Sequence, residues 1–210
     1  MPDTARHPIF ARLYAASSAG VERKGGAEHR AEMLAGVAGR VIEVGAGNGL
    51  NFGHYPPTVS EVVAVEPEPY LRERAEDAAR TAAVDVRVVD GLADALPAED
   101  AAFDAAVASL VLCSVPDQAD ALAELRRVVR PNGELRFYEH VVAAGRRGAL
   151  QRRLDDWGVW PRLTGGCHGA RDTGAAIAAN GWTIERVRRF DFKAGPAALP
   201  HIVGVARRDA

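Results

Sequence analysis

The chain has 210 residues, of which 48% are hydrophobic and 26% are charged, and its formal net charge is -2. This length predicts a single domain built around one core. The nearly balanced charge gives no general attraction for nucleic acid or anionic lipid, so we expect neither as a partner. No apolar run reaches the roughly 18 residues of a membrane span. The two cysteines, Cys113 and Cys167, lack metal-site spacing and no secretory signal precedes them, so we expect no metal and a cytoplasmic location.

The chain begins with two predicted helices, because apolar residues recur at helical spacing over residues 8 to 19 and 27 to 37. After them, short apolar runs that are typical of buried strands alternate with helical stretches. The expected strands cover residues 41–44, 61–66, 84–89, 103–112 and 134–142, and the expected helices between them cover about 69–80 and 117–129. This alternation is typical of a parallel sheet with helices on both faces.

The end of the chain departs from this alternation. Residues 182–192 and 201–208 are both strand-like, and the few residues around Gly195 and Pro196 that separate them predict an antiparallel hairpin at one edge of the sheet. Before this hairpin we expect an arginine-rich helical stretch, a loop and a helix at about 172–179. The expected fold is therefore α/β, a Rossmann-like doubly wound sheet that is mostly parallel, with seven strands and a C-terminal antiparallel hairpin.

The first predicted strand runs into glycine at alternate positions, Gly45, Gly47 and Gly49. A phosphate-binding P-loop would continue with Gly-Lys-Ser or Gly-Lys-Thr, whereas Leu50 follows Gly49 here. The dinucleotide fingerprint needs a glycine where Leu50 stands, so a nicotinamide cofactor is disfavoured. The pattern that remains is E-x-G-x-G-x-G, beginning at Glu43.

This pattern, together with the motifs that follow it, resembles the class I S-adenosylmethionine-dependent methyltransferases. Glu66 ends the second predicted strand, where the family places a carboxylate that accepts both ribose hydroxyls. Asp90 and Gly91 end the third strand, where the family contacts adenine. The fourth strand with its loop, and the fifth strand, agree in order and spacing, so the resemblance covers roughly residues 38 to 142. It implies that S-adenosyl-L-methionine is the cofactor and S-adenosyl-L-homocysteine the product.

The resemblance also implies roles for individual residues of the cofactor site. Glycines allow the backbone to approach the methionine half of the cofactor, Leu92 covers the adenine ring, and main-chain carbonyls of Ser109 and Leu110 receive the cofactor amino group. The expected cofactor-binding residues are Glu43, Gly45, Gly47, Gly49, Glu66, Asp90, Gly91, Leu92, Ser109 and Leu110.

Within this class the chain is most similar to the type 11 branch and to the small thiol S-methyltransferase-like proteins. The similarity lies in the stretches NFGHYPP, SLVLCSVPDQ, RPNGELRFYEHV, GGCHGARDT and HIVGVA. It implies methyl transfer to a small, lipophilic acceptor by in-line displacement, with a thiol favoured. Quinone, phenol, amine and phospholipid acceptors stay open, as does a different class of function, a non-catalytic S-adenosylmethionine-binding regulatory protein.

Two histidines are the candidate catalytic residues, because an imidazole can exchange a proton near neutral pH. His168 lies in the predicted loop before the last helix, and His140 ends the fifth strand, where Glu139 is expected to bind either His140 or a backbone group. The expected substrate residues are Tyr14, Trp157, Trp160, Cys167 and Arg171.

We expect a single methyltransferase domain over residues 1–210, as a monomer or homodimer. Its predicted parts are an N-terminal helical cap (1–38), a cofactor-binding core (39–142), a substrate cover (143–181) and the C-terminal hairpin (182–210).

Overall fold

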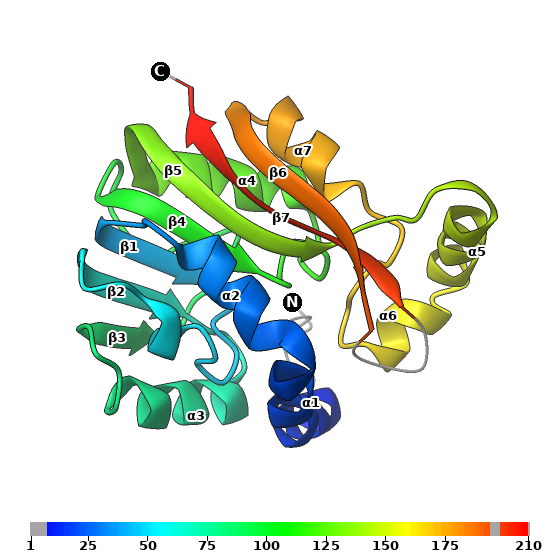
Figure 1. Cartoon of the computed structure of the whole chain (residues 1–210), viewed down its shortest axis with the longest axis horizontal. Helices are drawn as coiled ribbons and strands as arrows, with labels where there is room; N and C mark the ends of the chain where they lie inside the picture. The colour runs from blue at the N-terminus through cyan, green and yellow to red at the C-terminus, as the bar shows by residue number, and fades with distance from the viewer. Residues whose placement is uncertain (1–7, 194–197, 210) are drawn as a thin grey trace.

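The computed structural model describes residues 8–193 and 198–209, and its centre is a seven-stranded sheet (Figure 1). The strands are β1 Gly39–Val44, β2 Val59–Val65, β3 Val86–Val89, β4 Phe103–Ser109, β5 Val129–His140, β6 Trp182–Phe192 and β7 Leu199–Arg208. Their order across the sheet is β3-β2-β1-β4-β5-β7-β6. The first five strands pair in parallel, and β7 pairs antiparallel with both β5 and β6. The predicted mostly parallel sheet with an antiparallel hairpin is confirmed, while the predicted turn at Gly195 and Pro196 lies outside the described residues.

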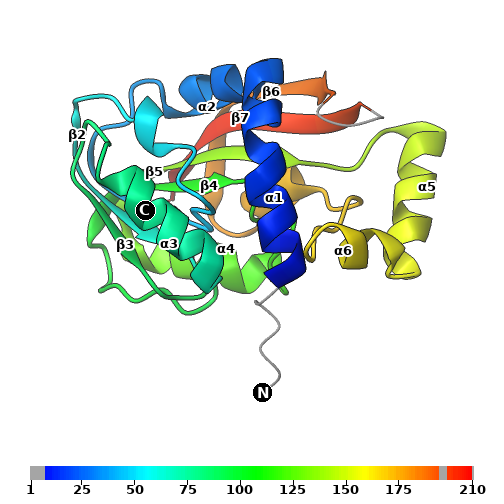
Figure 2. The same ribbon diagram turned by 90° about the horizontal axis from the view of Figure 1, so that it is seen from below.

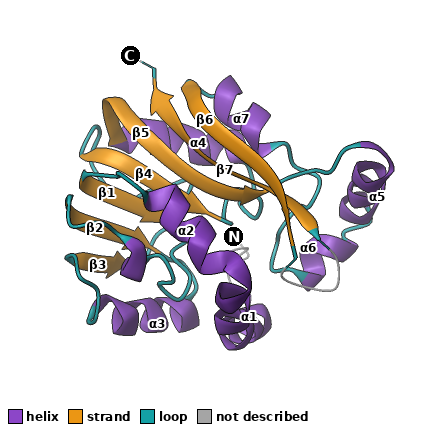
Figure 3. Ribbon diagram, in the orientation of Figure 1, coloured by secondary structure: helices purple, strands orange, loops and turns teal. Residues whose placement is uncertain are grey.

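Helices cover both faces of the sheet (Figure 3). They are α1 Pro8–Val21, α2 Ala27–Leu34, α3 Pro69–Ala79, α4 Gln118–Val128, α5 Gly145–Asp156, α6 Val159–Leu163 and α7 Thr173–Ala179, with a π-helical turn η1 Glu22–Gly26 and a 3-10 turn η2 Phe52–His54. Side chains of α4 and α7 pack on one face in one apolar cluster, and side chains of α2 and α3 pack on the other. The doubly wound arrangement follows from the strands, whose successive apolar residues face opposite sides.

Two strand boundaries differ from the sequence prediction by three residues or more, and the others by two residues at most. The fourth strand was expected to reach residue 112, but β4 ends at Ser109 because Leu110 adopts a left-handed backbone with φ 57°, which a strand cannot continue. The fifth was expected to begin at residue 134, but β5 begins at Val129, directly after α4. The left-handed Asn132, with φ 59°, interrupts the pairing of β5 with β4, whose register shifts between Val129 and Glu134.

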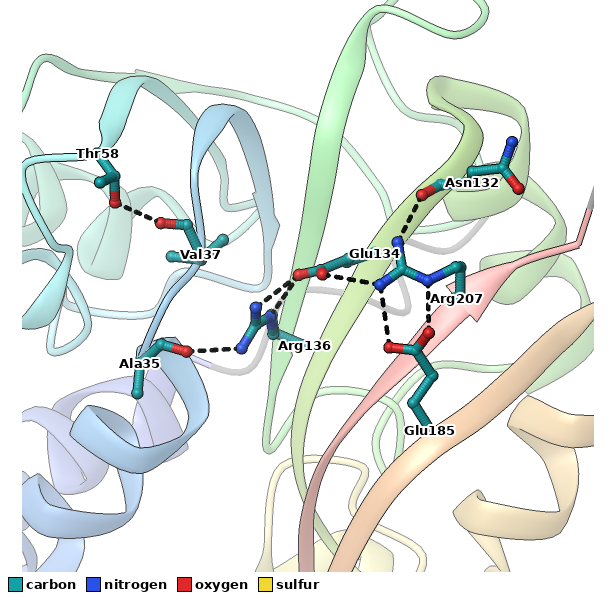
Figure 4. A network of polar contacts seen from close by, with 8 residues as sticks. All are labelled: Ala35, Val37, Thr58, Asn132, Glu134, Arg136, Glu185 and Arg207. Carbon is teal, nitrogen blue, oxygen red and sulfur yellow. Dashed lines mark hydrogen bonds and ion pairs between the residues drawn. The ribbon is translucent and has the colours of Figure 1, made fainter.

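An ionic network fixes the hairpin to the amino-terminal half of β5 (Figure 4). Glu134 accepts hydrogen bonds from Arg136 on its own strand, at 2.6 and 2.8 Å, and from Arg207 of β7, at 3.2 Å. Arg136 is buried and also donates to the carbonyl oxygen of Ala35, just after α2, at 2.8 Å. One carboxylate and one buried guanidinium thus connect α2, β5 and β7.

We expect Arg136→Ala to lower the free energy of unfolding by about 3 kcal/mol, because it leaves the Glu134 carboxylate and the Ala35 carbonyl without a buried partner. Chemical denaturation monitored by circular dichroism would measure this. Arg130 offers a matched control, since it belongs to the same strand and pairs with Asp104 through a side chain that is 61% exposed. Arg130→Ala should cost less than about 1 kcal/mol, and equal losses in the two variants would contradict the assignment.

Candidate functional site

A cavity of about 910 Å³ lies at the carboxyl ends of β1, β2, β3 and β4. Its volume is near the upper end of the roughly 300–1,000 Å³ that is usual for ligand pockets. Five segments line it: Phe10, Ala11 and Tyr14 of α1; Gly45 and Gly47 after β1; Val65 to Glu68 with Leu71; Gly91 to Asp94 after β3; and Ser109 to Val111 with Ser114 to Pro116 after β4. Gly165, Gly166 and His168 complete the wall.

The three glycines after β1 have different surroundings although all have positive φ, between 59° and 79°. A Cβ atom on Gly45 would lie 2.4 Å from Val111, and one on Gly49 would lie 2.8 Å from Ala78, so both positions are closed by neighbouring side chains. A Cβ atom on Gly47 would come only within 3.4 Å of the Tyr14 ring. Gly45 and Gly47 line the cavity, whereas Gly49 packs against α3 outside it.

Glu66, the residue after β2, presents its carboxylate to the cavity while the backbone holds it on the other side. Its Oε2 accepts from the Gly47 amide at 2.7 Å, and its Oε1 accepts from the Glu68 amide at 2.9 Å. Only 5% of the residue is exposed. Burial raises the pKa of Glu66 to about 7, against the lowering effect of the two amides. The site therefore contains a carboxylate that titrates near neutral pH.

The loop after β3 turns its two aspartates in opposite directions. The Asp90 side chain is 66% exposed and pairs with Arg72 of α3 at 2.9 Å, outside the cavity wall. Arg72 also donates to the Glu66 carbonyl at 2.8 Å. Asp94 lies between Leu92 and Ala95, which form a short antiparallel bridge, and it lines the cavity together with Gly91 and Leu92. Asp94, which the sequence did not single out, thus lines the cavity, whereas the expected Asp90 does not.

Buried polar side chains outside the cavity form a hydrogen-bonded network that reaches the wall at Ser109. Glu43 does not line the cavity, since its carboxylate accepts from Asn51 at 2.7 Å and from the Tyr55 hydroxyl at 2.6 Å. Burial raises the pKa of Glu43 to about 7. Buried Arg30 of α2 then donates to Asn51 at 2.8 Å and to the Ser109 hydroxyl at 3.0 Å.

Glu139 holds the loop that follows β4. Its Oε1 accepts from the amides of Val111 and Leu112, each at 3.0 Å, and its Oε2 accepts from the Cys113 amide at 3.3 Å. Of the two expected partners of Glu139, the structure shows the backbone. Burial raises the pKa of this carboxyl to about 7. The left-handed Leu110 begins the same loop, and its strained backbone is typical of a functional site.

The comparisons with known proteins agree with a site at this edge of the sheet. Residues 42–137 match the methyltransferase domain family. The thiol S-methyltransferase TMT1B of Rattus norvegicus is 33% identical to the chain over 175 residues, which make up 79% of the chain and 69% of that relative. The chain belongs to the class I S-adenosylmethionine-dependent methyltransferases.

Further relatives show that membership of this family does not define the methyl acceptor. The human TMT1B is 34% identical over 147 residues, or 67% of the chain, and the matched part spans 59% of the human protein's length. A demethylmenaquinone methyltransferase of Deinococcus radiodurans is 32% identical over 149 residues, covering 69% of the chain and 61% of that protein. Relatives with different acceptors therefore share this methyltransferase domain.

Solved methyltransferase-like structures share the fold at low identity. The YcgJ protein of Bacillus subtilis has a TM-score of 0.70 at 17% identity and covers 90% of the chain and 99% of its own. A geranyl diphosphate methyltransferase in complex with S-adenosylmethionine has a TM-score of 0.68 at 15% identity, covering 92% and 89%. In the described residues, no helix is long and apolar enough to cross a membrane. Nor do they contain three or more His, Cys, Asp or Glu grouped to hold a metal ion.

Two of the seven expected catalytic and substrate residues, Tyr14 and His168, lie in the cavity wall. The others lie outside it. His140 and Trp160 lie behind the wall, with Cys167 Sγ 3.6 Å from His140 Nδ1. Trp157 and Arg171 also lie outside the cavity wall, where each makes other contacts.

Trp157 follows α5 and is 57% exposed, with the Arg153 guanidinium 4.6 Å from its ring centre. Arg171 donates to the carbonyls of Leu112, at 2.9 Å, and Val115, at 2.6 Å. Trp157 therefore lies on the surface of the methyltransferase, and Arg171 braces the loop after β4 rather than lining the cavity.

We expect the affinity for S-adenosylhomocysteine to rise about 5- to 10-fold between about pH 6 and about pH 8. Glu66 in the free protein has a pKa of about 7, and hydroxyl donors of a bound ribose would favour its ionised form and lower that pKa. Below neutral pH, the binding of S-adenosylhomocysteine then releases a proton from Glu66, so a lower pH weakens the binding. Titration calorimetry at several pH values would measure the change.

Glu66→Gln is the matched variant, because it keeps the shape of the side chain and removes the charge. It should bind more weakly than the wild type at about pH 8 and lose the pH dependence. If the dependence persists in Glu66→Gln, another buried carboxyl such as Glu43 or Glu139 causes it and the assignment to Glu66 is wrong.

Proposed function

We propose that the enzyme transfers the methyl group of S-adenosylmethionine to the sulfur of a small, lipophilic thiol. The observation that carries this proposal is one cavity whose lining contains two unlike kinds of group. Backbone and carboxylate groups at Gly47, Glu66 and Asp94 line it, and so do the apolar Phe10, Val115 and Pro116 together with His168. We assign the first set to a cofactor half and the second to an acceptor half. The thiol S-methyltransferases among the relatives support the choice of acceptor atom.

The first half fits the cofactor. Gly47 leaves the backbone open toward the cavity, and the Glu66 carboxylate, already bound by two amides, retains lone pairs that can accept from a vicinal diol. Leu92 and Gly91 would lie against the adenine, with Asp94 rather than Asp90 positioned to accept from its amino group. The carbonyls of Ser109 and Leu110 would receive the amino group of the methionine half. The bound cofactor supplies an electrophilic methyl group on a sulfonium.

The second half would orient the acceptor and keep water out. Its apolar walls come from α1 and from the loop after β4, and they favour a lipophilic molecule by burying its surface. Helix α1 lies between α3 and α6 in the view of Figure 2, and its residues Phe10 and Tyr14 line the cavity. We therefore propose that the N-terminal cap and the segment around His168 enclose the acceptor.

His168 is the candidate for accepting the acceptor's proton. Its amide donates to the Cys113 carbonyl at 2.8 Å, which fixes the backbone of this residue at the cavity wall. A free thiol has a pKa of about 8.5, so a nearby imidazole can take its proton near neutral pH without a strong base. His140 is less well placed, because it lies behind the wall and packs against Trp160.

An acceptor panel tests the proposal directly. Thiophenol, phenol and aniline share one ring and differ in the nucleophilic atom, so the release of S-adenosylhomocysteine from each compares acceptor atoms at constant shape. A reduced quinone and phosphatidylethanolamine vesicles extend the panel to the remaining acceptor classes. We expect thiophenol to be methylated fastest. Preference for phenol or the reduced quinone would replace the thiol by an oxygen acceptor, and binding of the cofactor without any turnover would favour the regulatory protein.

We expect His168→Ala to lower turnover of thiophenol by about 10², the lower range for general acid–base catalysis, while the affinity for S-adenosylhomocysteine stays nearly constant. His54→Ala is a suitable control, since His54 belongs to η2 and lies outside the cavity wall. Full turnover by His168→Ala at every pH would assign the proton to His140 or to solvent.

A further inference from the structure

Two segments of the cavity wall each include a cysteine that does not itself line the cavity. Cys113 belongs to the loop after β4, whose neighbours Val111 and Ser114 line the cavity, and Cys167 precedes the lining residue His168. The backbones of the segments are joined by the hydrogen bond from the His168 amide to the Cys113 carbonyl, at 2.8 Å. The sequence contains no other cysteine, and both are free thiols.

The two sulfurs differ in chemistry because their surroundings differ. The Cys113 thiol donates toward Cys167, and the adjacent His140 ring adds to this effect, so the pKa of Cys167 is lowered. Contact with the Cys167 sulfur, followed by complete burial, raises the pKa of Cys113. Cys167 is thus the thiolate of the pair and Cys113 the thiol.

Near Cys167, two buried ring nitrogens lack hydrogen-bond partners among the described residues. His140 is only 4% exposed, yet its Nε2 has no hydrogen-bond partner within the described ranges, and the same is true of the buried Trp160 Nε1. A Cβ atom added to Gly169 would lie 3.2 Å from both rings, so the two rings flank one backbone position. Polar groups that are buried and unpaired are unfavourable for packing alone, which points to a chemical role for this group.

We propose that Cys113 and Cys167 are a redox pair that a hydroperoxide converts into a disulfide joining the two cavity walls. This modification goes beyond methyl transfer, because it changes the enzyme and consumes neither cofactor nor acceptor. Its basis is the adjacency of the two segments, the 3.6 Å contact between Cys167 Sγ and His140 Nδ1, and the unsatisfied polar groups beside it.

The reaction balances with hydrogen peroxide as the oxidant. The Cys167 thiolate attacks one peroxide oxygen, the O–O bond breaks, and the hydroxide that leaves takes up a proton to become water. Cys113 then attacks the Cys167 sulfenic sulfur, forming the S–S bond while the S–O bond breaks, and its proton leaves with that oxygen as a second water. The two thiols are oxidised together by two electrons, and one peroxide is reduced to two waters.

The disulfide should change the acceptor half of the cavity more than the cofactor half. Bonded sulfurs lie about 2.05 Å apart, so the bond draws together two segments that now meet without a covalent link. His168 and Ser114 each adjoin one of the cysteines and must move with them. Gly47 and Glu66 belong to a different part of the wall, since they follow β1 and β2, whereas the Cys113 loop follows β4.

Intact-mass spectrometry and thiol alkylation of the full chain after hydrogen peroxide treatment test the proposal. We expect the loss of two hydrogen atoms, both thiols protected from alkylation, and full reversal by dithiothreitol. Thiophenol turnover should fall about tenfold or more, since a displacement of order 1 Å in a site costs up to about 10² in rate. Affinity for S-adenosylhomocysteine should change less than twofold.

Cys113→Ser and Cys167→Ser are the matched variants, each compared with its own reduced form. Cys167→Ser should resist peroxide, and Cys113→Ser should gain oxygen atoms on Cys167 without a disulfide. Two alkylatable thiols in the treated wild type, or a disulfide that leaves turnover unchanged, would overturn the proposal. The mass and alkylation measurements need no methyl acceptor, so they stand apart from the outcome of the acceptor panel.

Discussion

The site depends on buried carboxylates that must be hydrogen-bonded, because an ionised group without partners is very costly away from water. Three strand ends each contribute one. Glu43 of β1 binds Asn51 and Tyr55, Glu66 after β2 binds the Gly47 amide, and Glu139 of β5 binds three successive amides after β4. Each carboxylate therefore holds a loop at this edge of the sheet, Glu43 the loop after its own strand and the other two a loop after a neighbouring strand.

Arg30 links the helical cap to this framework. It is only 4% exposed, and besides Asn51 and Ser109 it binds Glu22 of η1 at 3.1 Å. The cap helices thus reach the ends of β1 and β4 through one guanidinium, whose five donors can serve several acceptors at once. Because Tyr14 lies on the same cap and in the cavity wall, the position of the wall depends on this buried connection.

Much of the fold, and the placement of Gly47 and Glu66 in the cavity wall, could be predicted from the sequence, because local pattern determines them. The strands read as apolar runs, and Gly47 and Glu66 follow strands whose carboxyl ends meet at one edge of a parallel sheet. Arg30 could not be found in this way, since nothing local separates it from the many arginines on the surface. The placement of Asp90 outside the cavity wall could not be found either, since it depends on an ion pair with Arg72, which lies on another element.

The acceptor side was harder to predict, because its residues are arranged by contacts between distant segments. Trp157 and Trp160 are close in sequence, yet one is on the surface and the other lies behind the wall. A loop has no periodicity that would show which of its side chains faces the cavity. His168 and Cys167 are adjacent in the sequence, yet His168 lines the cavity and Cys167 does not.

The position of β7 between β5 and β6 has a consequence for how the protein is made. During synthesis β6 emerges before β7, and at that stage it has no neighbouring strand with which to pair. β6 can therefore join the sheet only through β7, either as a β6–β7 hairpin that docks on β5 or after β7 has paired with β5. In both orders β7 closes two ladders of hydrogen bonds, one with β5 and one with β6.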